Sequence, residues 1–187
     1  MKFANPIEIS FFDLIKHGKF DYIKLGKTKE WILNNFPNPD EFEENDNFFM
    51  TKKCNIWTYG DIEFFFNEKN ELYMIFCDSF NGIGAGNKWL SHEIDGGASL
   101  QLDKWIFEKV RKLTLPYVIE NFLINNIDFT TKCNQTTRSI ELKTTNNTVS
   151  LHFDTIEEKK TNLKFYKCCA IATGLSKWLT TKCVHQA

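Results

Sequence analysis

Four histidines and six cysteines are the residues whose types suit nucleophilic, acid–base or metal chemistry. The most site-like cluster is His92-Glu93-Ile94-Asp95, which stands directly before Gly96-Gly97. Three dissimilar polar groups in a loop are common, so this pattern favours a polar connection over a catalytic or metal site. No two histidines are spaced as a ligand pair, and His152 alternates with Leu151 and Phe153 along an expected strand. We therefore expect a protein that is not an enzyme and needs no metal or cofactor.

The cysteines favour free thiols over disulfides. The chain starts Met1-Lys2-Phe3-Ala4-Asn5-Pro6, without the long apolar stretch and small-residue cleavage site of a signal peptide. No stretch approaches the ~18–20 apolar residues of a membrane span. We therefore expect a cytoplasmic protein, in a compartment where thiols stay reduced. Cys77 and Cys168 each end an apolar run, where a thiol behaves as a small buried hydrophobic group.

Charge and glycine patterns speak against nucleic acid, membrane and phosphate ligands. The net charge is −1, which gives no whole-chain electrostatic attraction to a polyanion or a membrane. Gly82-Ile83-Gly84-Ala85-Gly86 lacks the lysine and hydroxyl residue that a phosphate-binding loop requires. This segment is expected to be a loop.

Hydrophobic periodicity predicts an α+β fold. Ser10 can cap a helix that Gly18 ends, and Thr28 can cap the next one before Pro37 and Pro39. The predicted helices are 9–18, 29–36, 105–110 and 114–124. The predicted strands are 48–57, 61–66, 71–77, 129–133, 138–143, 149–154 and 163–170.

The two halves of the chain resemble each other in order and spacing. Residues 28–36 align without a gap with 114–122, and 62–66 align with 149–153. The interpretation is two tandem units, each with two helices followed by an antiparallel sheet, with the helices packed on one sheet face. The predicted division is a first unit at 1–80, a glycine-rich linker at 81–102 and a second unit at 103–187. Coincidence between two ordinary α+β segments is the alternative.

The pattern resembles a known repeat. A helix opened by Gly26-Lys27-Thr28 and closed near Phe36-Pro37-Asn38-Pro39, followed by strands at 56–66 and 72–76, is similar to the repeat of the β-lactamase inhibitor protein. Small outer-membrane assembly lipoproteins share that unit, but this chain lacks a lipobox and a signal peptide, which removes β-lactamase as a target. In size, compartment and acidic segment the chain also resembles immunity proteins of contact-dependent growth inhibition systems.

The predicted hairpin of 61–66 and 71–77 has two apolar faces. Ile62, Phe64 and Phe66 share one face with Tyr73 and Ile75 by alternation. The opposite face carries Glu63, Phe65, Leu72, Met74 and Phe76. Either the rest of the chain buries this second face, which we favour for most of its side chains, or a partner covers part of it.

An acidic segment, 40–46, lacks helical and strand periodicity and is expected to be a loop. It places five carboxylates within seven residues. Such a run is usually a solvated loop, but it can also steer a basic partner and occupy sites meant for phosphates. A calcium loop is a third alternative, although the ligand register does not match.

The sequence therefore predicts an immunity protein that blocks a cognate antibacterial toxin, with a basic nuclease domain as one possible target. The alternative is a homo-oligomeric structural or adaptor protein, and the oligomeric state is open. The expected partner-binding residues are charged groups, apolar anchors and a polar rim. They are Asp40, Glu41, Glu43, Glu44, Asp46, Tyr59, Phe65, Trp89, His92, Glu93 and Asp95.

Overall fold

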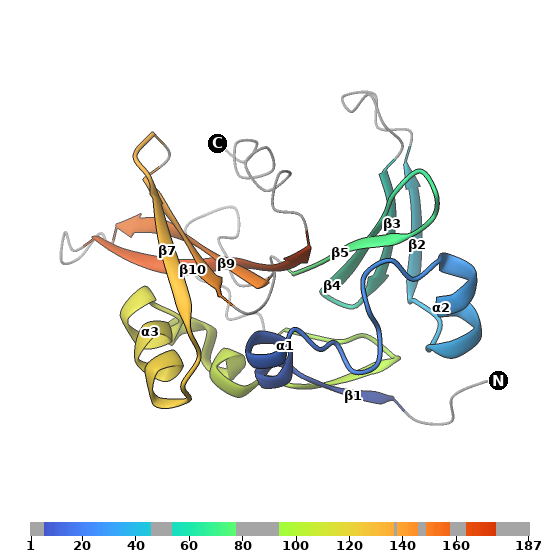
Figure 1. The fold of residues 1–187 in the computed structure, drawn as a ribbon, viewed down its shortest axis with the longest axis horizontal. Helices are drawn as coiled ribbons and strands as arrows, with labels where there is room; N and C mark the ends of the chain where they lie inside the picture. Colours follow the sequence, from blue (N-terminus) through green and yellow to red (C-terminus); the bar gives the residue numbers. More distant parts are fainter. Residues whose placement is uncertain are drawn as a thin grey trace.

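A computed structural model describes residues 6–45, 54–77, 94–136, 138–145, 149–157 and 164–174. Within these ranges the chain forms an α+β fold, which confirms the class expected from the sequence. Figure 1 shows a curved sheet with α1, α3 and a small second sheet beneath it, and with α2 at one end. The helices are α1 (Phe11–His17), α2 (Lys29–Asn35), α3 (Leu115–Ile124) and the 3-10 helix η1 (Trp105–Lys112). The strands are β1 (Ile7–Ser10), β2 (Glu41–Asn45), β3 (Cys54–Tyr59), β4 (Ile62–Phe66), β5 (Leu72–Cys77), β6 (Leu100–Asp103), β7 (Phe129–Asn134), β8 (Ser139–Thr144), β9 (Val149–Glu157) and β10 (Lys164–Gly174).

Helix boundaries follow the capping residues. The Ser10 hydroxyl accepts a hydrogen bond from the Asp13 amide, and Gly18 ends α1 in the left-handed conformation at φ 65°. The Thr28 hydroxyl accepts from the Trp31 amide at 3.2 Å. Thr114 occupies the same position before α3 without a side-chain hydrogen bond there. The caps expected at Ser10 and Thr28 are therefore present.

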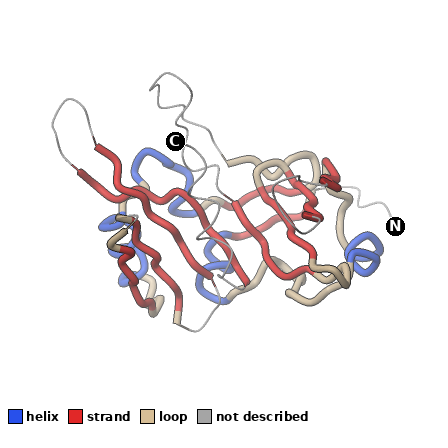
Figure 2. Tube along the Cα trace, turned by 90° about the horizontal axis from the view of Figure 1, so that it is seen from above, coloured by secondary structure: helices blue, strands red, loops and turns tan. Residues whose placement is uncertain are grey.

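The large sheet is continuous across the two halves of the chain. Its strand order is β2-β3-β4-β5-β10-β9-β8-β7, and all its neighbouring strands are antiparallel. The halves meet where β5 pairs with β10, with Cys77 opposite Ile171 and Met74 opposite Gly174. Figure 2 shows the strands side by side from above, with helices beyond them. A single sheet therefore joins both halves.

The described part of the expected linker 81–102 contains a buried residue and the start of a strand. Residues 81–93 lie outside the described residues, but Ile94 is fully buried and β6 begins at Leu100. β6 pairs in parallel with β1, with Ile7 opposite Leu100. The glycines Gly96 and Gly97 suggested a connection, whereas Leu100-Gln101-Leu102-Asp103 already alternates as an edge strand does. Apolar burial holds this segment against the core.

The short helix expected at 105–110 is present, as the 3-10 helix η1. Two further local predictions are wrong. Residues 7–10 form β1 before α1, although a helix was expected from Ile9. A bulge between Phe65 and Phe66 shifts the register opposite β5. Tyr73 therefore packs with Phe65 on the second face, while Leu72 joins the main core.

The main core lies between the helices and one face of the sheet. Aligned positions of the two halves are buried alike in it. The buried pairs are Ile32 and Val118, Phe36 and Phe122, Phe64 and Leu151, and Phe66 and Phe153. The core therefore takes equivalent side chains from each half.

Candidate partner-binding surface

The acidic segment is an edge strand, and the predicted loop at 40–46 is wrong. Residues 41–45 form β2, which pairs with β3 and lies at the end of the sheet. Phe42 lies between Glu41, which is exposed, and Glu43 along the strand, a short alternation that the surrounding carboxylates concealed. Only the backbones of Glu43 and Glu44 are described, and Asp46 lies outside the described residues. The backbone of residues 41–45 therefore forms the end strand of the sheet among the described strands.

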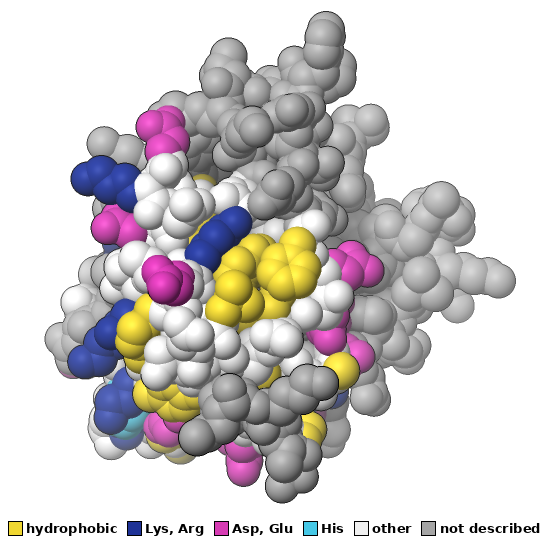
Figure 3. Space-filling model, turned by 90° about the vertical axis from the view of Figure 1, so that its right-hand side faces the viewer, with side chains coloured by type: hydrophobic (Ala, Val, Ile, Leu, Met, Phe, Trp, Pro, Cys, Tyr) yellow, Lys and Arg dark blue, Asp and Glu magenta, His cyan; other side chains and the backbone are white. Residues whose placement is uncertain are grey.

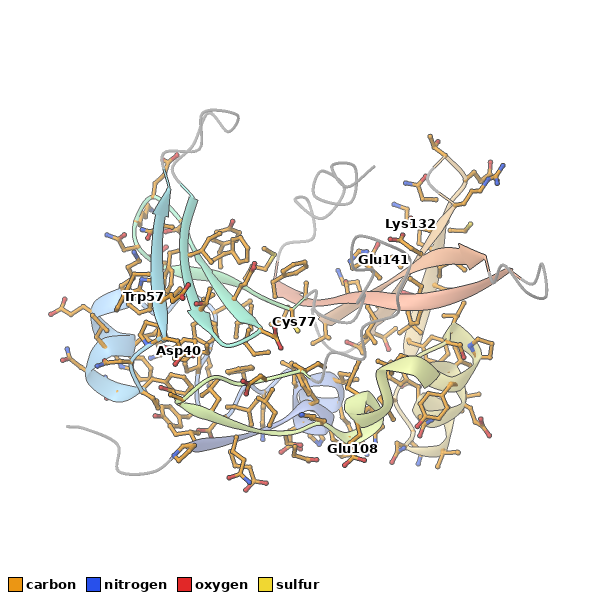
Figure 4. The ribbon with its side chains drawn as sticks, turned by 180° about the vertical axis from the view of Figure 1, so that it is seen from behind. Asp40, Trp57, Cys77, Glu108, Lys132 and Glu141 are labelled. Carbon is orange, nitrogen blue, oxygen red and sulfur yellow. The ribbon has the colours of Figure 1, made fainter. Side chains whose placement is uncertain are left out.

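Asp40 is fixed at the start of this edge. Its backbone amide donates to the Thr58 carbonyl at 2.8 Å. Its carboxylate accepts hydrogen bonds from the Gly60 amide at 2.8 Å and from the Ala98 amide at 3.1 Å. Figure 4 shows Asp40 beside the loop that leads into β6. Asp40 therefore joins β2, the β3–β4 turn and the 94–99 segment, which is a structural role.

Asp95 lies in the same junction. Its amide donates to the Asp61 carboxylate at 2.7 Å, and the Asp61 amide donates back to the Asp95 carbonyl at 2.8 Å. The Asp95 carboxylate accepts from the Gly97 amide at 3.2 Å. Within the described residues, no group of three histidine, cysteine or acidic side chains is arranged to hold a metal. The structure thus brings Asp40 and Asp95 together around glycine backbones, while His92 and Glu93 lie outside the described residues.

Tyr59 is a core residue, so its expected role as a surface anchor is wrong. Its side chain is fully buried, and its hydroxyl donates to the Pro37 carbonyl at 2.9 Å. Burial, with smaller contributions from the Asp40 carboxylate and from Tyr22 when it is ionised, raises the Tyr59 pKa well above its ordinary value. The strand register turns Tyr59 and Trp57 toward the helices, where a partner cannot reach the Tyr59 ring.

Phe65 lies on the opposite sheet face and is also buried. It belongs to a second cluster with Ile56, Met74, Phe76 and Ala172. The favoured expectation that this second face is buried is therefore confirmed for these side chains, and Phe65 is not an exposed anchor. Trp89 lies outside the described residues.

The exposed anchor that sequence reasoning missed is Phe42. Its side chain is 56% exposed and contacts Trp57 edge-on, with ring centroids 5.3 Å apart. Trp57 lies opposite Phe64 on the next strand, and Phe64 lies opposite Ile75. A row of apolar side chains therefore crosses four strands and ends at the solvent-exposed Phe42. Its position between glutamates was the available signal.

Lysines cover the aromatic rings next to this edge. The Lys29 ammonium lies 5.1 Å from the Trp57 ring centroid, and it donates a hydrogen bond to the Asn55 side chain. The Lys27 ammonium, which precedes α2, lies 4.2 Å from the ring centroid of Trp31 on that helix. Figure 3 shows this end of the molecule, where a Lys or Arg side chain lies across an apolar patch and acidic side chains lie on either side of it. Apolar and charged side chains thus lie close together at this end of the molecule.

The opposite end of the sheet carries a polar face. Lys132, Glu141 and His152 lie opposite one another on β7, β8 and β9, and Figure 4 labels the first two. The Ser150 hydroxyl donates to the Glu141 carboxylate at 3.0 Å. Burial lowers the His152 pKa, against the opposing effect of Glu141 and Asp154. The expected alternation of polar and apolar residues on β9 is confirmed.

Comparisons with known proteins identify no relative: no protein-family model, curated protein or solved structure matches this chain. Among the helices of the described residues, none has the length and apolar character needed to cross a membrane.

Proposed function

We propose that this chain is a binding protein that covers another protein with the β2 end of its sheet. The observation that carries the proposal is the edge strand itself, where Phe42 is exposed and its neighbours along the strand are Glu41, Glu43 and Glu44. Aromatic side chains supply much of the binding energy at protein interfaces, and surrounding charges select the partner and accelerate association. The complementary partner carries an apolar contact within a basic surface.

We propose further that the partner is a toxin acting in the cytoplasm, with the chain serving as its immunity protein. A nuclease must present positive charge to RNA or DNA. An acidic edge exploits that requirement, because the inhibitor occupies the surface that phosphates would occupy. The fixed Asp40 supports this role indirectly, since it holds the start of β2 in place and leaves Glu41 exposed.

The proposed scaffold is a pair of tandem units like those of the β-lactamase inhibitor protein. In support, each half runs from one strand through two helices to four strands in the same order. Thr28 and Thr114 precede the second helix of each half. Aligned β4 and β9 are the third strands of their four-stranded runs. Such a scaffold presents a preformed edge, which limits the entropy lost on binding.

Co-expression with the product of the adjacent reading frame tests the toxin proposal. We expect that product to arrest growth when expressed alone, the chain to restore growth, and the two to co-purify as a defined complex. Variants Glu41→Lys and Glu44→Lys should weaken protection, because they place positive charge against a basic surface. Growth arrest that the chain does not relieve contradicts the proposal.

A homo-oligomer is the second candidate. The specific observation for it is the exposed apolar end of α3, where Leu123 and Ile124 are 65% and 69% exposed. Light scattering after size-exclusion chromatography tests it. A stable oligomer that dissociates in a Leu123→Ser variant would favour this alternative over the toxin partner.

A further inference from the structure

Within the described part of the chain, the β2 strand has an open backbone edge. Among the described strands it pairs with β3 alone, at the end of the eight-stranded sheet. An edge strand presents backbone N–H and C=O groups that can pair with another chain. Proteins that recognise extended peptides use such an edge, with the backbone providing affinity and alternate side chains providing specificity. β2 therefore offers a main-chain binding surface in addition to its side chains.

The register of the sheet specifies which side chains an added strand would carry. The apolar row Phe42–Trp57–Phe64 ends at Phe42, so an apolar residue placed opposite Phe42 would continue it. Glu41 and Glu43 are the positions on either side of Phe42 along the strand. Residues opposite them would be favoured if basic, because opposite charges on paired strands attract.

Charge argues against a second copy of β2 as the occupant. An antiparallel pair of β2 strands centred on Phe42 would set Glu41 of each copy opposite Glu43 of the other. Like charges directly opposite each other on paired strands are destabilising. The edge thus disfavours self-pairing and favours a basic strand from a different chain.

We infer that β2 takes an extended segment of alternating basic and apolar residues from the partner, added as a strand to the sheet. The inference rests on the proposed function and specifies how that partner is held. At ~3.4 Å per residue, the five residues of β2 span about 17 Å, which sets the length of the paired segment. A negatively charged or uniformly polar segment does not meet these requirements.

A short peptide of alternating lysine and valine is the probe, with a matched peptide of glutamate and valine as its control. Amide hydrogen exchange of the full chain is followed residue by residue during titration. We expect the basic peptide to slow exchange at alternate residues of 41–45 by about tenfold or more, since only outward-facing amides gain a partner. The acidic peptide should leave these amides unchanged.

Two variants at similarly exposed positions distinguish peptide binding at the β2 edge from nonspecific hydrophobic binding. Phe42→Ser should lower the affinity for the basic peptide by about tenfold. Leu123→Ser, at a similarly exposed residue of α3, should bind the peptide with the affinity of the parent chain. Equal binding by Phe42→Ser and the parent overturns the inference. The inference is also overturned if amide exchange at 41–45 is unchanged at the highest soluble peptide concentration. It is overturned as well if the peptide slows exchange only in β7, the strand at the other end of the sheet. Circular dichroism confirms that both variants are folded.

The growth assay distinguishes a failure of this inference from a failure of the proposed function. If Phe42→Ser and a Glu41→Gln, Glu43→Gln, Glu44→Gln variant still neutralise the neighbouring toxin as the parent does, toxin binding stands and strand addition at β2 is wrong. If the peptide slows amide exchange in β2 but the chain does not relieve the growth arrest, strand addition stands and the toxin proposal is wrong.

Discussion

The Asp40 carboxylate accepts a hydrogen bond from the backbone amide of Gly60, with 2.8 Å between oxygen and nitrogen. Its second oxygen accepts from the Ala98 amide. Three segments far apart in the sequence therefore meet at one charged side chain: the start of β2, the β3–β4 turn and the approach to β6. One of the five acidic residues expected to contact a partner thus holds together the segments at the start of β2.

Removal of this carboxylate should destabilise the fold. Asp40→Ala leaves the Gly60 and Ala98 amides without their acceptor, and we expect the free energy of unfolding to fall by about 1–2 kcal/mol, since water can reach both amides. Urea denaturation measures the change. Glu41→Ala is the control, because this exposed neighbour should alter stability by less than about 0.5 kcal/mol. Equal losses for the two variants would contradict the role given to Asp40.

Gly60 should tolerate no side chain. It has φ +56°, and a Cβ there would lie 2.4 Å from the Gly97 nitrogen and 2.5 Å from the Asp95 carbonyl oxygen. Both atoms belong to the backbone, so Gly60→Ala must push two segments apart in addition to adopting a strained φ. We expect a loss of about 3 kcal/mol or more in thermal or urea unfolding.

Gly26 provides the matched control for backbone strain alone. It also has a positive φ, +89°, but a Cβ there would meet nothing within 4 Å. Gly26→Ala should therefore cost about 1–2 kcal/mol, the price of the left-handed conformation without a clash. A Gly26→Ala variant as unstable as Gly60→Ala would show that the close approach at Gly60 does not matter.

The features that could be predicted from the sequence are those whose signals come from residues close together in the chain. The Ser10 and Thr28 caps and the hairpin of β4 and β5 were predicted because their signals lie within a few residues of each other. β2 was missed because its composition is that of a solvated loop, and its strand character comes from pairing with β3. The bulge that moved Tyr73 adds a residue to the strand and so breaks the alternation on which the face assignment relied.

The candidate site was less predictable than the fold. Burial separates Tyr59 and Phe65 from Phe42, and burial depends on contacts with distant segments. The hydrogen bond from Ala98 to Asp40 spans a sequence separation of 58 residues, which no local pattern reports. The strand register of 41–45 and the exposure of Glu41 and Phe42 required the three-dimensional structure.

The buried hydroxyl of Tyr59 should make stability depend on pH in the alkaline range. Its pKa in the folded protein is raised above the ordinary value of 10.0, so above that pH the unfolded chain loses a proton that the folded chain retains. The folded state then binds more protons than the unfolded state, and stability falls as the pH rises. Tyr59→Phe removes this contribution and the hydrogen bond to Pro37, at a cost of about 1 kcal/mol near neutral pH.

Urea unfolding of both proteins between neutral pH and the alkaline range measures this effect. The stability difference in favour of the parent should shrink as the pH rises through the ordinary tyrosine range. Because lysines and other tyrosines titrate there in both proteins, only the difference is informative. A constant difference would contradict the assignment.

The two halves of the chain should unfold together. Phe36 and Phe122 occupy aligned positions in one core, and the β5–β10 pair carries the sheet from one half to the other. Phe36→Leu and Phe122→Leu should each lower the free energy of unfolding by about 1–2 kcal/mol. If the halves form one cooperative unit, either substitution lowers the stability of both halves equally. Calorimetry should then give one transition, and native-state hydrogen exchange should show β4 and β9 losing protection by the same amount. A Phe36→Leu variant that weakens β4 while β9 keeps its protection would indicate separate units at 1–80 and 103–187, joined only by a sheet contact.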